Sequence, residues 1–432
     1  MEHLRTFINY RTLIMLFVIA FALLAVFFFD SVAVHLFVVW AVAFAACWLV
    51  KFDLIHPYCW FSLTFCLYNT SYTILYAMGY DTYAGYSYQN TVFTLIALAV
   101  VLTVVGGEVV DDKLEDNITL INTKYNDLLF YLFAILAVVF AFILLRRGYS
   151  GKIAMKEAND VFYSLGVHLI RWMLVIMLIQ MCYNKCVENK KVIAYVLVSL
   201  AASVILGLLT GERDMFIRTI LVLLFVLFYF GKIKKKHLFI FVPIGVVIMI
   251  LSVNFKYYFL RGEMNTNHME GNFLYQFLMS DFRATGRNTQ FLINNDWTKG
   301  YYGIKILFNE MVRGLVPFVN TFNPSTWYNN EVYPGTFKGQ AFTYVGFGYV
   351  IGGVLGIVLV FILLGAFIRY TYRHHTKSLY SLVFYLYSIS IVAGCYRGTI
   401  NTIIGTSLKG ALIAILMSIF LSRFANKKRF VK

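Results

Sequence analysis

The chain begins with two long apolar runs that almost join. Residues 12–29 read TLIMLFVIAFALLAVFFF without a charged residue, and VAVHLFVVWAVAFAACWLV follows after only Asp30 and Ser31. About 20 apolar residues in a helix cross the hydrocarbon core of a membrane. We therefore predict two membrane-spanning helices joined by a tight turn. The first run is too long for a signal-peptide core and ends in Phe-Phe-Phe-Asp, so we expect it to remain as the first span.

Apolar runs of this kind recur along nearly the whole chain. We predict an all-α integral membrane protein with about twelve transmembrane helices and a helical cap. Residues 1–254 would hold nine spans, 255–340 one large loop, and 341–432 three spans and a basic tail. The expected spans are 12–29, 31–50, 57–79, 90–109, 127–145, 161–183, 191–209, 215–231, 237–254, 342–368, 378–395 and 404–422.

The composition supports one integral bundle rather than soluble domains. Of the 432 residues, 60% are hydrophobic and 13% are charged, whereas soluble domains average about 45–50% and 25%. The net charge of +16 would suggest nucleic-acid binding in a soluble protein. Here the cations lie mainly in loops, so we expect membrane lipids and anionic lipid-linked ligands as partners, and no nucleic acid. The cysteines lack the spacing of a zinc site.

The distribution of Lys and Arg predicts the orientation. Short cytoplasmic loops of membrane proteins are enriched in these residues. With the N-terminus inside, the majority of the 37 cations fall in inside segments, and the outside loops after spans one and three hold none. Both termini would then be cytoplasmic, and the loop 255–340 extracytoplasmic.

The turn after span five breaks this pattern, because Arg146, Arg147 and two lysines fall outside. These cations are candidates for substrate binding. The structural alternative is a solvated loop in which Glu157 and Asp160 balance the charge.

Three positions place arginines in or beside the membrane. Arg171 lies about 15 Å into span six, at 1.5 Å per residue, so it should face the bundle interior; it either contacts ligand or bonds to backbone carbonyls. Arg213 opens span eight, where free amides and a cation would suit an anion, unless a local ion-pair cap explains it. Arg397 lies between the last two spans.

The loop 255–340 is rich in aromatic residues and asparagine and has little proline, so we expect a folded cap. Two helical patterns appear, one over 273–287 and one near 302–315, where Lys305, Asn309 and Arg313 recur every four residues. Rings such as those of Tyr258 and Trp297 would suit sugar surfaces. The alternative is that they form an interfacial belt and the core of the cap.

The nucleotide-binding and hydrolase motifs are missing. The chain has no Walker A sequence, no HExxH helix and no GxSxG elbow. We therefore predict a site that works through cations, hydrogen bonds and shape, with neither metal nor cofactor.

Four stretches together resemble the O-antigen polymerase family of oligosaccharide repeat-unit polymerases. The resemblance covers most of the chain, and the span count and the place of the large loop agree with it. One described family pattern, an arginine and a glycine with ten residues between them, is not matched by Arg261, Arg283 or Arg287. The stretches begin at Gly207 (GLLTGERD), Tyr258 (YFLRGE), Tyr302 (YGIKIL, with Val316-Pro317) and Gly339 (GQAFTYVGFGYVIGG).

The resemblance implies a reaction. A glycan on undecaprenyl diphosphate would be transferred to an incoming lipid-linked repeat unit at the periplasmic face of the bacterial inner membrane. Lipopolysaccharide O-antigen or a related surface polysaccharide would be the product. The fold would resemble metal-independent membrane glycosyltransferases of the GT-C type. A chain-length regulator and a flippase would be partners.

The leaving diphosphate assigns roles to the cations, because preorganised guanidinium groups stabilise developing phosphate charge. Candidate general bases are Glu263, His268 and Asp281. Candidate catalytic arginines are Arg213, Arg261, Arg283, Arg287 and Arg397. Candidate substrate-binding residues are Arg146, Arg147, Arg171, Tyr258, Trp297, Lys305 and Arg313.

Two other functions remain open. An O-antigen ligase would use the same donor with a lipid A-core acceptor. A non-enzymatic flippase for lipid-linked oligosaccharides would predict repeated halves and no large outer cap.

Overall fold

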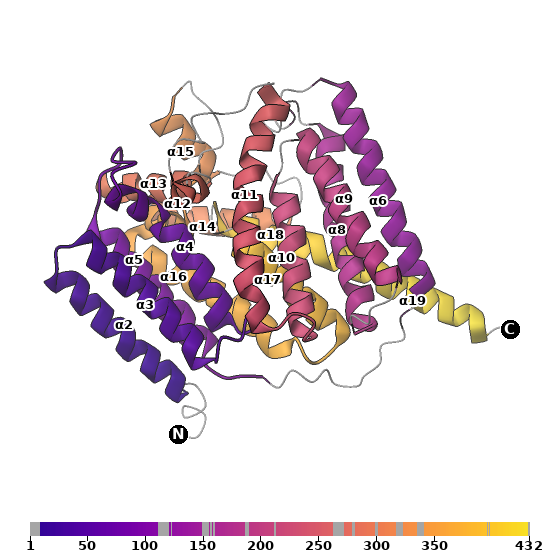
Figure 1. The fold of residues 1–432 in the computed structure, drawn as a ribbon, viewed down its shortest axis with the longest axis horizontal. Coiled ribbons are helices and arrows are strands. Elements are labelled where there is room, and N and C mark those ends of the chain that lie inside the picture. The colour runs from indigo at the N-terminus through magenta and orange to yellow at the C-terminus, as the bar shows by residue number, and fades with distance from the viewer. Residues whose placement is uncertain are drawn as a thin grey trace. The chain divides into compact units, whose positions relative to one another are not determined.

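A computed structural model describes most of the chain, and its elements are α-helical with short 3₁₀ and π segments (Figure 1). The chain forms two compact units. Unit 1 comprises residues 1–111, 271–373 and 395–404, and unit 2 comprises 112–270, 374–394 and 405–432. The described residues are 9–110, 121, 123–148, 155, 158, 160–185, 190–210, 213–261, 272–278, 281–298, 301–316, 323–334, 341–394, 396 and 398–430.

The first two helices confirm the predicted hairpin. α2 (Tyr10–Phe28) and α3 (Val32–Leu49) pack against each other, and Figure 1 shows them side by side in indigo. The Asn9 side chain caps α2 by accepting the Arg11 N–H at 3.3 Å. The side chain satisfies one of the free amides at the helix start.

Each of the twelve predicted spans contains a helix. Unit 1 continues with α4 (Pro57–Ala77), α5 (Tyr88–Val105) and α16 (Tyr344–His374). Unit 2 holds α6 (Thr123–Arg146), α8 (Val161–Tyr183), α9 (Lys190–Thr210), α10 (Arg213–Tyr229), α11 (Leu238–Arg261) and α17 (Leu379–Gly394). The last run comprises α18 (Ile400–Ser407), η3 (Leu408–Leu412) and α19 (Ile413–Phe430).

Eight helices of the described chain are long and apolar enough to cross a membrane, and two more are shorter apolar helices. The chain is therefore a multi-pass membrane protein. α4 falls outside both groups because it buries polar residues such as Asn69 and Ser71 among Tyr and Phe side chains. It packs against α3, α5 and α13. A helix covered on several sides by protein needs less apolar surface than one that faces lipid.

The predicted tenth span differs from a continuous helix. Gly352 and Gly353 have non-helical backbone angles, and Gly353 has φ +58°. A Cβ on Gly348 would lie 2.6 Å from Ile357 Cα, although nine residues of straight helix span about 13.5 Å. Residues 344–351 therefore fold back on residues 354–374, and glycine allows both the turn and the close approach.

The predicted cap contains helices where the two patterns were seen. They are α12 (Phe273–Leu278), α13 (Asp281–Asn294), α14 (Tyr301–Leu315) and α15 (Pro324–Val332). The first pattern is split between α12 and α13. The helix of span nine, α11, continues to Arg261, so the expected loop boundary at residue 255 lies inside a helix.

Unit 2 is organised around α8, which packs against α6, α9, α10 and α17. Figure 1 shows α6, in purple, beside α8 and α9, in magenta. Residues 173–181 of α8 are all buried. Asp160 begins the helix by accepting the N–H groups of Phe162 and Tyr163 at 2.8 and 3.2 Å.

Candidate functional site

The candidate site lies on α13, which packs closely on α4. A Cβ added to Gly286 would lie 2.9 Å from the Tyr72 Cβ, so glycine allows the two helices to approach. The Ser71 hydroxyl donates to the Phe282 carbonyl at 2.9 Å. The Phe282 ring also meets the Tyr68 ring edge-on, with centroids 4.7 Å apart. These contacts fix α13 on a helix of the membrane domain.

The other side of α13 is held by the segments around α15 and α16. The Asn288 side chain donates to the Ala341 carbonyl at 2.9 Å and accepts from the Tyr333 hydroxyl at 3.2 Å. The Thr289 hydroxyl donates to that of Thr343 at 3.0 Å. With both sides anchored, the position of the two arginines on α13 is well defined.

Arg283 forms an ion pair with Asp81, which lies in the loop between α4 and α5. The Asp81 side chain is only 2% exposed, and that of Arg283 is 26% exposed. A carboxylate buried to this extent requires a cation or strong donors. The charge of Arg283 is therefore offset by the protein itself.

Arg287 lies one helical turn after Arg283 and is half-buried. None of the described carboxylates forms an ion pair with it. Its guanidinium carbon lies 5.5 Å from the centre of the exposed Tyr83 ring, and its buried Nε has no hydrogen-bond partner among the described residues. Tyr72 and Tyr328 lie close enough to interact electrostatically with the Arg287 guanidinium.

The tyrosines around Arg287 supply hydroxyl groups at a cation. Tyr328 is fully buried, and its hydroxyl lies near that of Tyr333. Burial raises the pKa of Tyr328 above its ordinary value, so this hydroxyl stays protonated. A partly exposed guanidinium that pairs with no described carboxylate, and that lies near the protonated Tyr328 hydroxyl, is suited to bind an anion. We call Arg287, Tyr72, Tyr83 and Tyr328 the Arg287 site.

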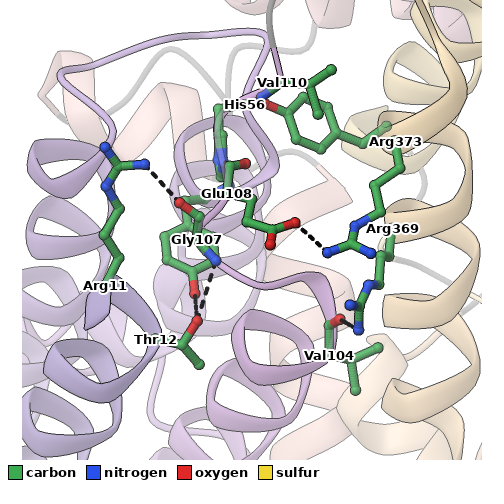
Figure 2. Close-up of polar contacts among 11 residues, drawn as sticks. Arg11, Thr12, His56, Val104, Gly107, Glu108, Val110, Arg369 and Arg373 are labelled. Atoms are coloured by element: carbon green, nitrogen blue, oxygen red, sulfur yellow. Dashed lines mark hydrogen bonds and ion pairs between the residues drawn. The ribbon is translucent and has the colours of Figure 1, made fainter. Parts of the chain in front are cut away.

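A second arginine cluster lies at the opposite end of unit 1, where the chain turns after α3 and α5 (Figure 2). Arg11 Nη1 donates to the Gly107 carbonyl at 2.8 Å, and Arg369 Nη1 donates to the Val104 carbonyl at 3.0 Å. Arg373 forms an ion pair with Glu108. All three arginines therefore bind the segment 104–108.

His56 adds to this cluster. Its Nδ1 accepts the Tyr58 N–H at 3.0 Å, so its Nε2 carries the proton and donates to the Glu108 carbonyl at 3.0 Å. The Tyr372 hydroxyl accepts the Val110 N–H at 3.2 Å. We call Arg11, His56, Glu108, Arg369 and Arg373 the Glu108 clamp. Their contacts indicate a structural role.

A buried carboxylate on α14 is a further polar centre of unit 1. Glu310 is fully buried, and Arg313 Nη2 lies 2.8 Å from its Oε1. The Thr399 hydroxyl donates to the same carboxylate. Burial raises the pKa of Glu310. The backbone around Thr399 is also held by α16, because the Tyr344 hydroxyl donates to the Thr399 carbonyl at 2.6 Å.

The other described cap residues of the predicted site differ in their surroundings. Lys305 is exposed on α14. Trp297 is half-buried, and its ring lies 5.8 Å from Phe291 and 6.0 Å from Trp327 between ring centres. Arg313 is paired with Glu310. Among the predicted cap arginines whose side chains the structure describes, Arg287 is thus the one that pairs with no described carboxylate.

Three predicted residues are described in unit 2. Arg147 pairs with Asp160, which supports the structural alternative for that turn, and Arg146 beside it is exposed. Arg171 is half-buried. His168 lies close enough to Arg171 and Lys409 to interact electrostatically with both. Trp172 donates to the Lys409 carbonyl at 3.3 Å.

Several predicted residues fall where the structure describes less. Glu263, His268 and Arg397 lie outside the described residues. Arg213, Tyr258, Arg261 and Asp281 lie on described helices, but their side chains are outside the described part. Their roles stay predictions.

Sequence reasoning missed Asp81, Tyr83 and Glu310. The loop after α4 drew attention only for its lack of cations, although it holds four tyrosines and an aspartate within residues 80–88 (YDTYAGYSY). That density was a usable signal. Glu310 lies beside the polar stripe of α14, and no local pattern distinguishes it.

Comparison with protein-family models, with curated proteins and with solved structures finds no match to this chain.

Proposed function

We propose that the chain is a membrane glycosyltransferase that polymerises undecaprenyl-diphosphate-linked oligosaccharide repeat units. The observation that carries the proposal is Arg287, a half-buried arginine on a fixed cap helix whose charge no described carboxylate balances. An anionic substrate group would supply the missing counter-charge. The multi-pass membrane fold would hold the lipid part of such a substrate.

The reaction forms one glycosidic bond and breaks one bond to phosphate. A hydroxyl of the incoming repeat unit attacks the anomeric carbon of the growing glycan, and undecaprenyl diphosphate leaves with the bonding electrons. The hydroxyl proton passes to a base, for which Glu263, His268 and Asp281 are the candidates. Charge develops on the leaving diphosphate, so a cation at that place lowers the barrier.

Arg287 would bind the diphosphate. Its guanidinium offers a planar set of donors that matches phosphate oxygens. Arg283 would act differently, because its pair with Asp81 makes it a positioning residue for α13. Catalytic roles for Arg213, Arg261 and Arg397 remain predictions from the sequence.

The test replaces Arg287 with Ala in the natural host and separates the surface polysaccharide by length. We expect long chains to disappear and single repeat units to remain on the acceptor, because loss of one transition-state donor lowers the rate about 10²–10³-fold. Arg373→Ala is the matched control, since it removes an arginine from an exposed pair in the Glu108 clamp.

The outcomes separate the candidate functions. Long chains that persist with Arg287→Ala at normal protein level would contradict the role of Arg287. Deletion of the whole chain should leave single units on the acceptor. A bare acceptor after deletion would indicate a ligase, and repeat units trapped on the cytoplasmic leaflet would indicate a flippase.

A further inference from the structure

A polar pocket lies beside the Arg287 site in unit 1. It has a volume of about 410 Å³, which is within the usual range of roughly 300–1,000 Å³ for small-molecule sites. It opens where α2 turns into α3, α5 begins and α13 ends. Its polar and aromatic lining residues are Asp30, Tyr86, Ser87, Tyr88, Gln89 and Asn294.

The side chains that line this pocket select a type of ligand. They include a carboxylate, two amides, a serine hydroxyl and two tyrosine rings, and no Lys or Arg lines the pocket. Asp30 would repel a phosphate. Carboxylate and amide groups accept from and donate to hydroxyls, and the ring of Tyr88, 46% exposed, offers an apolar face. An uncharged, hydroxyl-rich molecule therefore fits better than an anion.

The pocket wall is held in place by a network from α13. Asn294 Nδ2 donates to the Ala84 carbonyl at 2.6 Å, and Gln290 Nε2 lies 3.4 Å from the Ser87 carbonyl and 3.3 Å from Asn294 Oδ1. Gln290 is fully buried, yet its Oε1 has no hydrogen-bond partner among the described residues. A buried amide oxygen without a donor is costly, and it lies beside the pocket lining.

The wall opposite α13 is also fixed. His35 Nε2 lies 2.7 Å from the Phe29 carbonyl and donates to it, so His35 Nδ1 accepts from the Tyr86 hydroxyl. The Ser87 hydroxyl accepts the Gln89 N–H at 3.2 Å and begins α5. The part of the pocket wall formed by Tyr86, Ser87 and Asn294 is therefore held by hydrogen bonds.

One helix connects the pocket to the Arg287 site. Gln290 and Asn294 lie three and seven residues after Arg287, so they share its face of α13. Seven residues of helix measure about 10.5 Å. The pocket wall at Asn294 therefore lies within the length of an oligosaccharide from Arg287, on the far side of the segment 84–87 that covers Gln290.

We propose that this pocket binds the sugar residues of the lipid-linked oligosaccharide, next to the diphosphate at Arg287. The inference rests on the proposed function for the identity of the ligand. The pocket itself is predicted to bind neutral glycan without lipid or diphosphate.

The test measures binding of a neutral oligosaccharide to the full-length protein in detergent micelles by saturation-transfer NMR. The probe is the repeat-unit oligosaccharide released from the host's surface polysaccharide by mild acid and freed of phosphate. We expect Asp30→Asn and Asn294→Ala each to weaken binding about 5–10-fold, the effect of one lost hydrogen bond. Asn295→Ala is the matched control, because its amide bonds to the Phe291 carbonyl within α13.

The two proposals can fail separately. Equal binding by the wild type, Asp30→Asn and Asn294→Ala overturns the pocket assignment, as does a wild type that does not bind the oligosaccharide. Arg287→Ala should retain neutral-glycan binding while it abolishes polymerisation. If Arg287→Ala leaves polymerisation intact but Asn294→Ala weakens glycan binding, the proposed role of Arg287 fails and the pocket stands.

Discussion

The two ends of unit 1 use arginine in different ways. In the Glu108 clamp, Arg11, Arg369 and Arg373 all bind the segment 104–108. At the other end, Arg283 is paired with Asp81, whereas the charge of Arg287 is left without a described carboxylate. Whether an arginine has a structural role or belongs to a candidate ligand site is therefore indicated by the groups that it contacts.

The largest expected loss of stability follows replacement of Arg283, one of the two arginines of α13. Arg283→Ala should lower the free energy of unfolding by about 3 kcal/mol, because it leaves Asp81 buried without its cation. Arg287→Ala should lower it by less than about 1 kcal/mol, the scale of its contact with Tyr83. Thermal and denaturant unfolding in detergent measures both.

A double variant is the control for the loss of stability expected in Arg283→Ala. Asp81→Asn combined with Arg283→Gln should recover part of the stability lost in Arg283→Ala, because no unpaired charge stays buried. The contrast between the two arginines is wrong if Arg287→Ala destabilises the protein as much as Arg283→Ala does.

An intermediate effect concerns Glu310, which is buried and paired like Asp81. Burial raises its pKa above the ordinary 4.5, so the folded state holds this proton more tightly than the unfolded state. Its contribution to stability is therefore full below about pH 4.5 and declines as the pH rises through the raised pKa. Glu310→Gln should remove that decline.

The measurement for Glu310 is the slope of unfolding free energy against pH, at most about 1.4 kcal/mol per pH unit for one group. The absolute stability of Glu310→Gln also falls, because Arg313 loses its counter-charge, so only the slope is compared. A wild type that gains stability as the pH rises above 4.5 would show that pairing with Arg313 outweighs burial.

Small effects on stability, and none on polysaccharide length, are expected in the Glu108 clamp. Arg11→Ala should cost about 0.5–1.5 kcal/mol, the net value of one hydrogen bond. Arg373→Ala should cost about 0–1 kcal/mol, since both partners of its ion pair are exposed by more than a third. Neither change should alter polysaccharide length by gel analysis, and a loss of long chains in either variant would remove the distinction between the two ends.

The positions of the helices could be read from the sequence because long apolar runs make their contacts mainly with lipid and with one another. The break at Gly352–Gly353 could not, because two glycines in an apolar run leave the hydropathy unchanged. It depends on close packing, with Gly348 against Ile357 and Gly303 against Ile351.

The site could be predicted only in part. Arg283 and Arg287 are four residues apart on one helix and look equivalent in the sequence. The structure separates them through Asp81, which lies 202 residues away from Arg283. A partner at that distance in the chain has no local signature, so no reading of α13 alone could assign one arginine to structure and the other to ligand.

The fold-back of α16 has a consequence for the order of assembly during synthesis. Chains emerge from the ribosome N-terminal end first, so α13 finds its partner helix α4 already made. A Cβ on Gly303 of α14 would meet the Ile351 carbonyl at 1.8 Å, which shows how closely α14 sits on residues 344–351. Residues 344–351 are translated about fifty residues after Gly303. They form the surface on which α14 packs only after the turn at Gly352–Gly353 has formed. The second half of the cap therefore docks late, once the tenth apolar run has left the translocation channel and bent back on itself.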